Sequence, residues 1–228
     1  MKKIRLWLTG VVVAVAVAFI CAGCNDSGGA GNEAAVFLNS LYWGAEDGDG
    51  GGSYDTVTIG RKIWMTKNMD LWIENSWWRE NSWCYDNSED NCSTYGRLYT
   101  WEAAKKACQL VVGWRLPSNN EWADLVSAAG AGFEEDAGNK LKSESYWRKY
   151  ESQDGNGTDD FGFSALPGGS RNSDGTFDDN EGYQGYWWTA TEKDGEAYYR
   201  NIHYDNGNVN EHITPNKNHG YSVRCVKG

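Results

Sequence analysis

Between positions 100 and 130, apolar residues recur three or four positions apart in two successive stretches. The first set is Trp101, Ala104, Ala107 and Cys108, and the second is Trp122, Leu125, Val126 and Ala129. This spacing places each set on one face of an amphipathic helix. The sequence therefore predicts two short helices, joined by a turn at 113–117.

The residues at the ends of these stretches are typical of helix termini. Thr100 precedes the first stretch, where its hydroxyl can accept a hydrogen bond from a free backbone amide. Ser118 and Glu121 have the spacing of a capping box, in which each side chain bonds the backbone amide of the other residue. Gly130 predicts a left-handed stop for the second helix.

Other stretches alternate apolar and polar positions, as half-buried strands do. Positions 57–59 and 62–65 predict a hairpin around a Gly-Arg turn, and turn residues at 194–195 and 205–207 delimit further strands. Residues 139–143 predict one more helical turn. Two helices with short antiparallel strands and long loops define an α+β domain. The further strands that we expect are 186–191, 197–204 and 221–226.

The N-terminus has the pattern of a secretory signal peptide, with three positive charges, an apolar stretch and small residues. Its end, Ala-Gly-Cys, is similar to a bacterial lipobox, which predicts lipidation of Cys24. Ordinary cleavage and an uncleaved helical anchor are the alternatives. Asn25 instead of Asp after the cysteine favours the outer membrane over the inner one. We expect an exported protein, lipid-anchored to the cell envelope.

We divide the chain into a signal peptide at 1–23, a tether at 24–53 and a domain at 54–228. The tether is rich in Gly, Asp, Glu, Asn and Ser, a composition typical of a flexible linker. The apolar segment 35–43 interrupts it, and we expect this segment to pack on the domain; docking to a partner is the alternative.

Composition and charge limit the classes of molecule that the protein can bind. The formal net charge is −11, so phosphate-rich nucleic acid is excluded as the main partner. Neutral polysaccharide, cations and other proteins remain compatible with this charge. Aromatic residues make up 14% of the chain, which indicates a packed domain.

Four cysteines lie in the domain, and an exported chain favours disulfides between them. Three pairings are possible. Cys84 and Cys92 flank a turn-rich stretch and are the easiest pair to close, which leaves Cys108 with Cys225. A metal site is the alternative, but no histidine lies near Cys84 or Cys92 and their spacing is too wide for a close metal-binding pair.

Several patches occur in an order that resembles the Fibrobacter succinogenes major paralogous domain family. The patches are IWMTKNM at 63–69, SWCY at 82–85, YGRLYTW at 95–101, GWRLP at 113–117, FGFSALPGG at 161–169, YWWTAT at 186–191 and SVRCV at 222–226. The resemblance implies a C-type-lectin-like fold that is related to the formylglycine-generating enzyme domain. It also implies a disulfide from the first helix to the last strand, in agreement with Cys108–Cys225.

The same resemblance raises an enzymatic alternative. Formylglycine-generating enzymes bind copper through two cysteines near the end of the domain, but Cys225 is the only cysteine after Cys108. The three histidines stand in no recognisable catalytic motif. We therefore expect a protein without enzymatic activity.

Two acidic, glycine-containing loops are candidates for calcium, which takes six to eight oxygen ligands. Neither loop has EF-hand spacing, and turn formation by solvated Asp and Asn is the alternative interpretation. The candidate ligands are Asp154, Asn156, Asp159 and Asp160 in one loop, and Asp174, Asp178, Asp179 and Glu181 in the other.

The tryptophans divide into two groups. We expect Trp64, Trp101, Trp114, Trp122, Trp187 and Trp188 to be core residues. Those in the polar stretch 71–80 are candidates for stacking on sugar rings, with packing as the alternative. The candidate ligand-binding residues are Trp72, Trp77, Trp78, Tyr146, Trp147 and Tyr183.

The combined prediction is a non-catalytic envelope lipoprotein that binds an extracellular ligand, most favourably a polysaccharide. The alternatives are a structural or adhesion protein that binds other envelope proteins, and an enzyme of the formylglycine-generating type. We expect the protein to contact the membrane through the lipid at its N-terminus.

Overall fold

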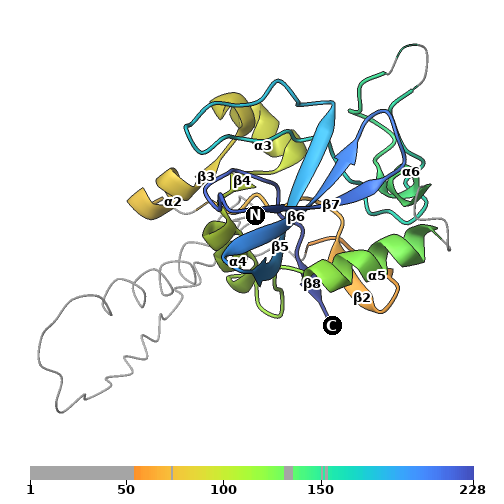
Figure 1. The fold of residues 1–228 in the computed structure, drawn as a ribbon, viewed down its shortest axis with the longest axis horizontal. Helices are drawn as coiled ribbons and strands as arrows, with labels where there is room; N and C mark the ends of the chain where they lie inside the picture. The colour runs from red at the N-terminus through yellow and green to blue at the C-terminus, as the bar shows by residue number, and fades with distance from the viewer. Residues whose placement is uncertain (1–53, 73, 131–135, 150, 152–153) are drawn as a thin grey trace, which may run out of the picture. The chain divides into compact units, whose positions relative to one another are not determined.

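The computed structural model describes residues 54–72, 74–130, 136–149, 151 and 154–228, which form a mixed α+β domain (Figure 1). The predictions for the signal peptide, Cys24, the tether and the segment 35–43 lie outside the described residues. Five α-helices are described: α2 Ser76–Asn81, α3 Glu89–Tyr95, α4 Trp101–Gln109, α5 Asn119–Gly130 and α6 Ala137–Leu141. A 3-10 helix, η1 Tyr85–Asn87, precedes α3.

The strands form three small antiparallel sheets. The first has the order β1-β2-β8, the second pairs β3 with β4, and the third has the order β5-β6-β7. Their bounds are β1 Thr56–Ile59, β2 Lys62–Met65, β3 Ser82–Trp83, β4 Leu98–Tyr99, β5 Gln184–Lys193, β6 Glu196–His203, β7 Val209–Thr214 and β8 Val226–Lys227. Because β2 pairs with β8, the first and last strands of the domain share one sheet.

Two of the three predicted turns are confirmed by the strand pairing around them. Ile59 pairs with Lys62 around Gly60, whose φ of 62° belongs to the left-handed region. Lys193 pairs with Glu196 around Asp194 and Gly195, with φ of 54° and 86°. Two successive positive φ angles are the signature of the type I′ turn that the Asp-Gly sequence favours.

The caps of the two predicted helices form as the sequence indicates. The hydroxyl of Thr100 accepts a hydrogen bond from the amide of Ala103 at the start of α4. At the start of α5, the Ser118 hydroxyl accepts from the Glu121 amide at 3.2 Å, and the Glu121 carboxylate accepts from the Ser118 amide at 2.9 Å. Both helix bounds therefore agree with the prediction at their N-terminal ends.

Other local predictions were wrong or incomplete. Gly130 is the last residue of α5 and has no positive φ, so it does not provide the left-handed stop. The polar stretch 71–80 contains the start of α2, whose first turn is capped by the Asn75 side chain. The predicted strand 221–226 is mostly joined by single bridges, because its residues contact Tyr99 and Trp187 from different sheets. The sequence pattern did not predict β7 or α3.

The tryptophans assigned to the core are buried, in two adjoining clusters. One contains Trp101, Trp114 and Trp188, and the other contains Trp64, Trp122 and Trp187. Trp64, Trp122 and Phe163 pack edge to face with ring centroids 5.4 to 5.9 Å apart. Such contacts add to the free energy gained from burying the rings.

Both predicted disulfides are present. Cys84–Cys92 joins the residue before η1 to α3, and Cys108–Cys225 joins α4 to the segment before β8. Since the second bond links positions 117 residues apart, it ties the predicted helical pair to the end of the chain.

A fully buried arginine fixes the segment that leads to the candidate site. The Arg224 guanidinium donates to the backbone carbonyls of Met65, Phe163 and Ser164 and to the side-chain oxygen of Asn68. Asn68 in turn donates to the carbonyl of Tyr95 at 2.8 Å. These bonds satisfy the polar atoms of both side chains in the core and hold the chain at position 68 against the end of α3.

Candidate functional site

The structure separates the predicted ligand-binding aromatics by exposure. Trp78 and Trp147 are only 3% and 4% exposed, so the prediction that they offer a face to ligand was wrong. Trp78 packs edge to face on Tyr99 with ring centroids 6.2 Å apart, and the Trp147 indole donates to the buried Ala165 carbonyl. Trp72 and Tyr146 are 38% and 56% exposed. Trp77 is half-buried, with the Lys106 ammonium over its ring at 4.4 Å.

Trp72 lies over a buried guanidinium. The Cζ atom of Arg97 is 4.7 Å from the Trp72 ring centroid, within the range of a cation–π contact. Arg97 also forms ion pairs with Asp70 at 3.3 Å and with Glu89 at 3.1 Å. We call Asp70, Trp72, Glu89 and Arg97 the Trp72 cluster.

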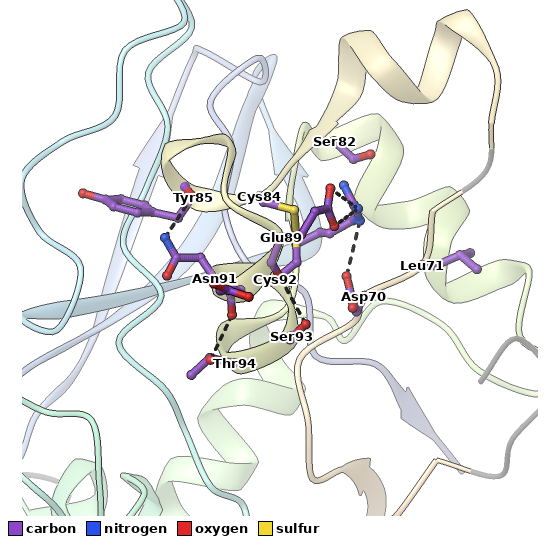
Figure 2. The surroundings of a disulfide bond; sticks show 12 residues. Asp70, Leu71, Ser82, Cys84, Tyr85, Glu89, Asn91, Cys92, Ser93 and Thr94 are labelled. Carbon is purple, nitrogen blue, oxygen red and sulfur yellow. Dashed lines mark hydrogen bonds and ion pairs between the residues drawn. A yellow bond between two sulfur atoms is a disulfide. The ribbon is translucent and has the colours of Figure 1, made fainter. Parts of the chain in front are cut away.

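The elements around the Cys84–Cys92 disulfide position this cluster (Figure 2). Figure 2 shows Glu89 next to the disulfide, with Asp70 approaching from the neighbouring segment. The disulfide joins α3 to the residue before η1, so the helix that carries Glu89 is fixed at Cys92. The cluster is therefore built on a cross-linked helix.

The backbone of Arg97 is held on its other side by the segment 68–72. The Arg97 amide donates to the Met69 carbonyl at 2.9 Å. Gly96, the C-cap of α3, has a φ of 77°, and a Cβ atom there would lie 2.7 Å from the Cβ of Asn68. Only glycine permits both the positive φ and this approach. Gly96 thus brings Arg97 beside Asp70 and Trp72.

The charges of the cluster are unequally exposed. The Arg97 side chain is 9% exposed, whereas those of Asp70 and Glu89 are 49% and 80% exposed. Burial raises the pKa of Asp70 to about 6, although the Arg97 charge acts to lower it. Because the Asp70 and Glu89 side chains are exposed, the surface beside the Trp72 ring presents carboxylate oxygens, which accept hydrogen bonds. The buried Arg97 charge balances one of the two carboxylates.

A second group of residues surrounds Tyr146. Its ring packs edge to face on Tyr95 with centroids 5.8 Å apart, and the Tyr95 hydroxyl donates to the Glu181 carboxylate. Arg148 lies 3.8 Å from that carboxylate and 4.9 Å from the centroid of half-buried Tyr183. We call Tyr95, Tyr146, Arg148, Glu181 and Tyr183 the Tyr146 cluster. Burial, together with the bond to Glu181, raises the pKa of Tyr95.

The carboxylates of the predicted calcium loops mostly bond their own loops. Asp159 accepts from the amide and hydroxyl of Ser164, and Asp174 accepts from the amide and hydroxyl of Thr176. Asp178 accepts from Ser170, and Glu181 belongs to the Tyr146 cluster. These bonds match the turn-forming interpretation of the acidic residues.

One of these loops borders a cavity of about 390 Å³. Asp154, Asn156 and Asp160 line it together with Asp136 and Asn139, which are not among the predicted ligands. Asp179 of the other loop is exposed. Among the described residues, neither loop brings three carboxylates close enough to share an ion through one oxygen each. Whether calcium binds there stays a prediction.

The described residues do contain one compact group of potential metal ligands, formed by Cys84, Glu89 and Cys92. Both cysteines are joined in a disulfide, and disulfide sulfurs do not provide the thiolates that metals require. This group is therefore part of the scaffold of the Trp72 cluster.

Sequence reasoning predicted Trp72 but missed the residues that hold it. Arg97 stands inside the patch 95–101 that carries the family resemblance, and its residue type alone predicts no role in a site. Asp70 and Glu89 are two of 32 acidic residues, so their types alone carried no signal. Only the pairing of 68–72 with 96–97 brings these side chains together.

The family is decided by a comparison of the chain with family models. The model of the Fibrobacter succinogenes major domain matches residues 57–227. The chain belongs to this family. The match to the Fibrobacter succinogenes major domain covers every element from β2 to β8 and both clusters described above.

The other comparisons add no relative. No curated protein and no solved structure matches the chain. In the described part of this Fibrobacter succinogenes major domain, no helix has the length and apolarity needed to cross a bilayer. The local geometry of the domain is therefore the basis for any functional proposal.

Proposed function

We propose that this Fibrobacter succinogenes major domain protein is a non-catalytic binding protein for extracellular polysaccharide. The observation that carries the proposal is the exposed Trp72 ring, held over Arg97 and flanked by the Asp70 and Glu89 carboxylates. A fixed aromatic face can stack on the apolar face of a sugar ring, and carboxylate oxygens accept hydrogen bonds from its hydroxyl groups.

The electrostatics favour a ligand without strong negative charge. The two exposed carboxylates outnumber the single buried cation of the cluster. An anionic polysaccharide would meet repulsion at the Trp72 ring, whereas a neutral one would gain hydrogen bonds. The overall charge of −11 acts in the same direction.

The proposed location and fold extend the sequence predictions. We propose export and lipid anchoring at Cys24, with placement in the outer membrane. A C-type-lectin-like arrangement is supported by the Cys108–Cys225 bond and by the pairing of β2 with β8. Mass spectrometry of the mature N-terminus tests the anchor, because lipidation adds acyl chains to Cys24 and a Cys24→Ala variant would lack them.

Binding to polysaccharide is tested with the purified full chain by retention on cellulose, hemicellulose and glycan arrays. Trp72→Ala should lower the affinity roughly 5- to 100-fold, if a sugar ring stacks on the indole about as strongly as a nucleic-acid base stacks on an aromatic side chain. Trp72→Phe should retain part of the affinity, and Val112→Ala, at a side chain that is 95% exposed, serves as the control. No retention of the unmodified chain on any glycan would refute the proposal.

The alternative is an adhesion protein that binds other envelope proteins. The observation that favours it is Ile213, which is 41% exposed on β7 at the edge of the third sheet. Edge strands can pair with a strand of another chain. This alternative would be supported if the unmodified chain captures envelope proteins, the Ile213→Lys variant does not, and neither is retained on glycans.

A further inference from the structure

Tyr146 has a backbone conformation that a bulky residue rarely adopts. Its φ is 76°, in the left-handed region that favours glycine. Such a conformation costs free energy and persists only where the surrounding structure enforces it. The exposed ring gains little burial in return, since 56% of the residue is accessible.

The neighbours of Tyr146 explain how this conformation is enforced. Trp147 is buried, and its indole nitrogen donates to the Ala165 carbonyl at 3.0 Å while its amide donates to the Asn156 side chain at 3.0 Å. The Arg148 amide donates to the Gly182 carbonyl at 2.8 Å. With the Trp147 side chain buried and the backbone of Arg148 held by Gly182, the positive φ turns Tyr146 out to the surface.

The polar groups beside the ring are also fixed. Glu181 accepts a hydrogen bond from Tyr95 and pairs with Arg148, which in turn lies over the Tyr183 ring. The cluster thus offers one exposed ring next to a carboxylate and a guanidinium. This combination provides a stacking face, acceptors and donors for the hydroxyl groups of a sugar.

Tyr146 and Trp72 lie near opposite ends of the same helix. Tyr146 packs on Tyr95, the last residue of α3, and the Trp72 cluster includes Glu89, its first residue. The rise of 1.5 Å per residue separates these two helix positions by about 9 Å. Six residues at 3.6 per turn also set the two side chains about 120° apart around the helix axis. A ligand that contacts both rings must therefore pass around α3 as well as along it.

We infer that the Tyr146 cluster is a second sugar-binding contact, and that the ligand of the domain is a chain of sugars spanning α3. This inference rests on the proposed function. A single terminal sugar would reach only one cluster. Two linked contacts on one chain raise the affinity for a polymer well above that for a short fragment.

The test compares oligosaccharides of increasing length with the polymer that the full chain retains. For the unmodified protein, affinity should rise with length until the ligand reaches both clusters. Trp72→Ala and Tyr146→Asn should each lower polymer affinity roughly 5- to 100-fold, and each should flatten the dependence on length. Val112→Ala should change neither quantity.

The Tyr146→Asn variant also separates binding from folding. Asparagine tolerates a positive φ better than tyrosine, so thermal stability should be retained or raised while polymer affinity falls. If Tyr146→Asn leaves polymer affinity unchanged while Trp72→Ala lowers it, the second contact is refuted and the proposed function stands. If neither glycan polymer nor oligosaccharide binds the unmodified chain, both proposals fail.

Discussion

The guanidinium of Arg97 lies 4.7 Å from the centre of the Trp72 ring and pairs with Asp70 at 3.3 Å. One buried cation thus supports an exposed ring and balances a carboxylate. This arrangement predicts that Arg97 acts on ligand through the orientation of Trp72 and through the charge of Asp70.

Replacing Arg97 by Met keeps much of the side-chain length and removes the charge. The pKa of Asp70, about 6 in the intact domain, should rise further, because the Arg97 charge acts to lower it. Glycan affinity should fall as Trp72 loses its support. Titration of the Asp70 carboxyl by NMR measures the first effect. An unchanged or lower Asp70 pKa would show that the ion pair is absent in solution.

The two disulfides should contribute unequally to stability. In the chain-entropy model, the bond between Cys108 and Cys225, separated by 117 positions, contributes about 5 kcal/mol. Cys84–Cys92, separated by 8, contributes about 2.5 kcal/mol. Denaturant unfolding of the two paired Cys→Ser variants measures this difference.

The shorter disulfide should matter more for binding than for folding. Removing Cys84–Cys92 loosens α3, which carries Glu89 at one end and Tyr95 at the other. The variant should therefore fold but bind polymer more weakly. Full polymer affinity in the Cys84→Ser, Cys92→Ser protein would contradict the role assigned to α3.

Glu121 predicts an acid-dependent contribution to stability. Hydrogen bonds from Arg115, followed by those from Ser118 and Lys62, lower the pKa of Glu121 to about 2. A lowered pKa means that the ionised carboxylate stabilises the folded state above its unfolded pKa of about 4.5. This contribution is lost as the pH falls from 4.5 through 2.

Glu121→Gln should accordingly be less stable than the unmodified protein at pH 7, by about 1–2 kcal/mol, because it loses the ion pair and weakens the capping box. The difference should shrink as the pH approaches 2. Urea unfolding at several pH values measures it, with Glu102→Gln on the exposed face of α4 as a matched control. A difference independent of pH would argue against the lowered pKa.

Lys142 predicts a second pH-dependent contribution to stability, in the alkaline range. Its side chain is buried and donates to the carbonyls of His203, Tyr204 and Asn206, and burial lowers its pKa to about 8. Between pH 8 and the unfolded pKa of 10.5, the unfolded state binds the additional proton. Stability contributed by this group therefore rises with pH across that window.

A Lys142→Met variant lacks this titration. It should be less stable at pH 7, since three carbonyls lose their donor, by about 1–3 kcal/mol. The unmodified protein should gain up to about 1.4 kcal/mol per pH unit relative to the variant between pH 8 and 10. Lys140→Met, at a neighbouring lysine that pairs with Asp136 on the surface, provides the control.

Much of the local structure was determined by the sequence. The capping box of Ser118 and Glu121, the cap at Thr100 and the Asp194-Gly195 turn depend on residues close together in the chain, and all three form as predicted. The two disulfides followed from four cysteines and one easy closure. The sequence patches that resemble the family predicted the family of the whole domain, and the family model that matches residues 57–227 confirms it.

Exposure was decided only by the tertiary structure. Tyr146 and Trp147 are neighbours in the sequence, yet one is 56% exposed and the other 4%. The difference depends on a positive φ that no local pattern indicates for tyrosine and on a hydrogen bond to distant Ala165. The conformation of Gly130 also could not be predicted from its type, because this glycine is the last residue of α5 and does not have the expected positive φ.

The Trp72 cluster shows the same limit. Its four residues come from 70–72, from the start of α3 and from the residue after its glycine cap. The local pattern identified Trp72, because an aromatic residue among polar neighbours can be recognised from the residue types alone. The partners of that ring depend on which segments pair across the fold, and the chain at Asn68 is held there by Arg224, 156 positions away.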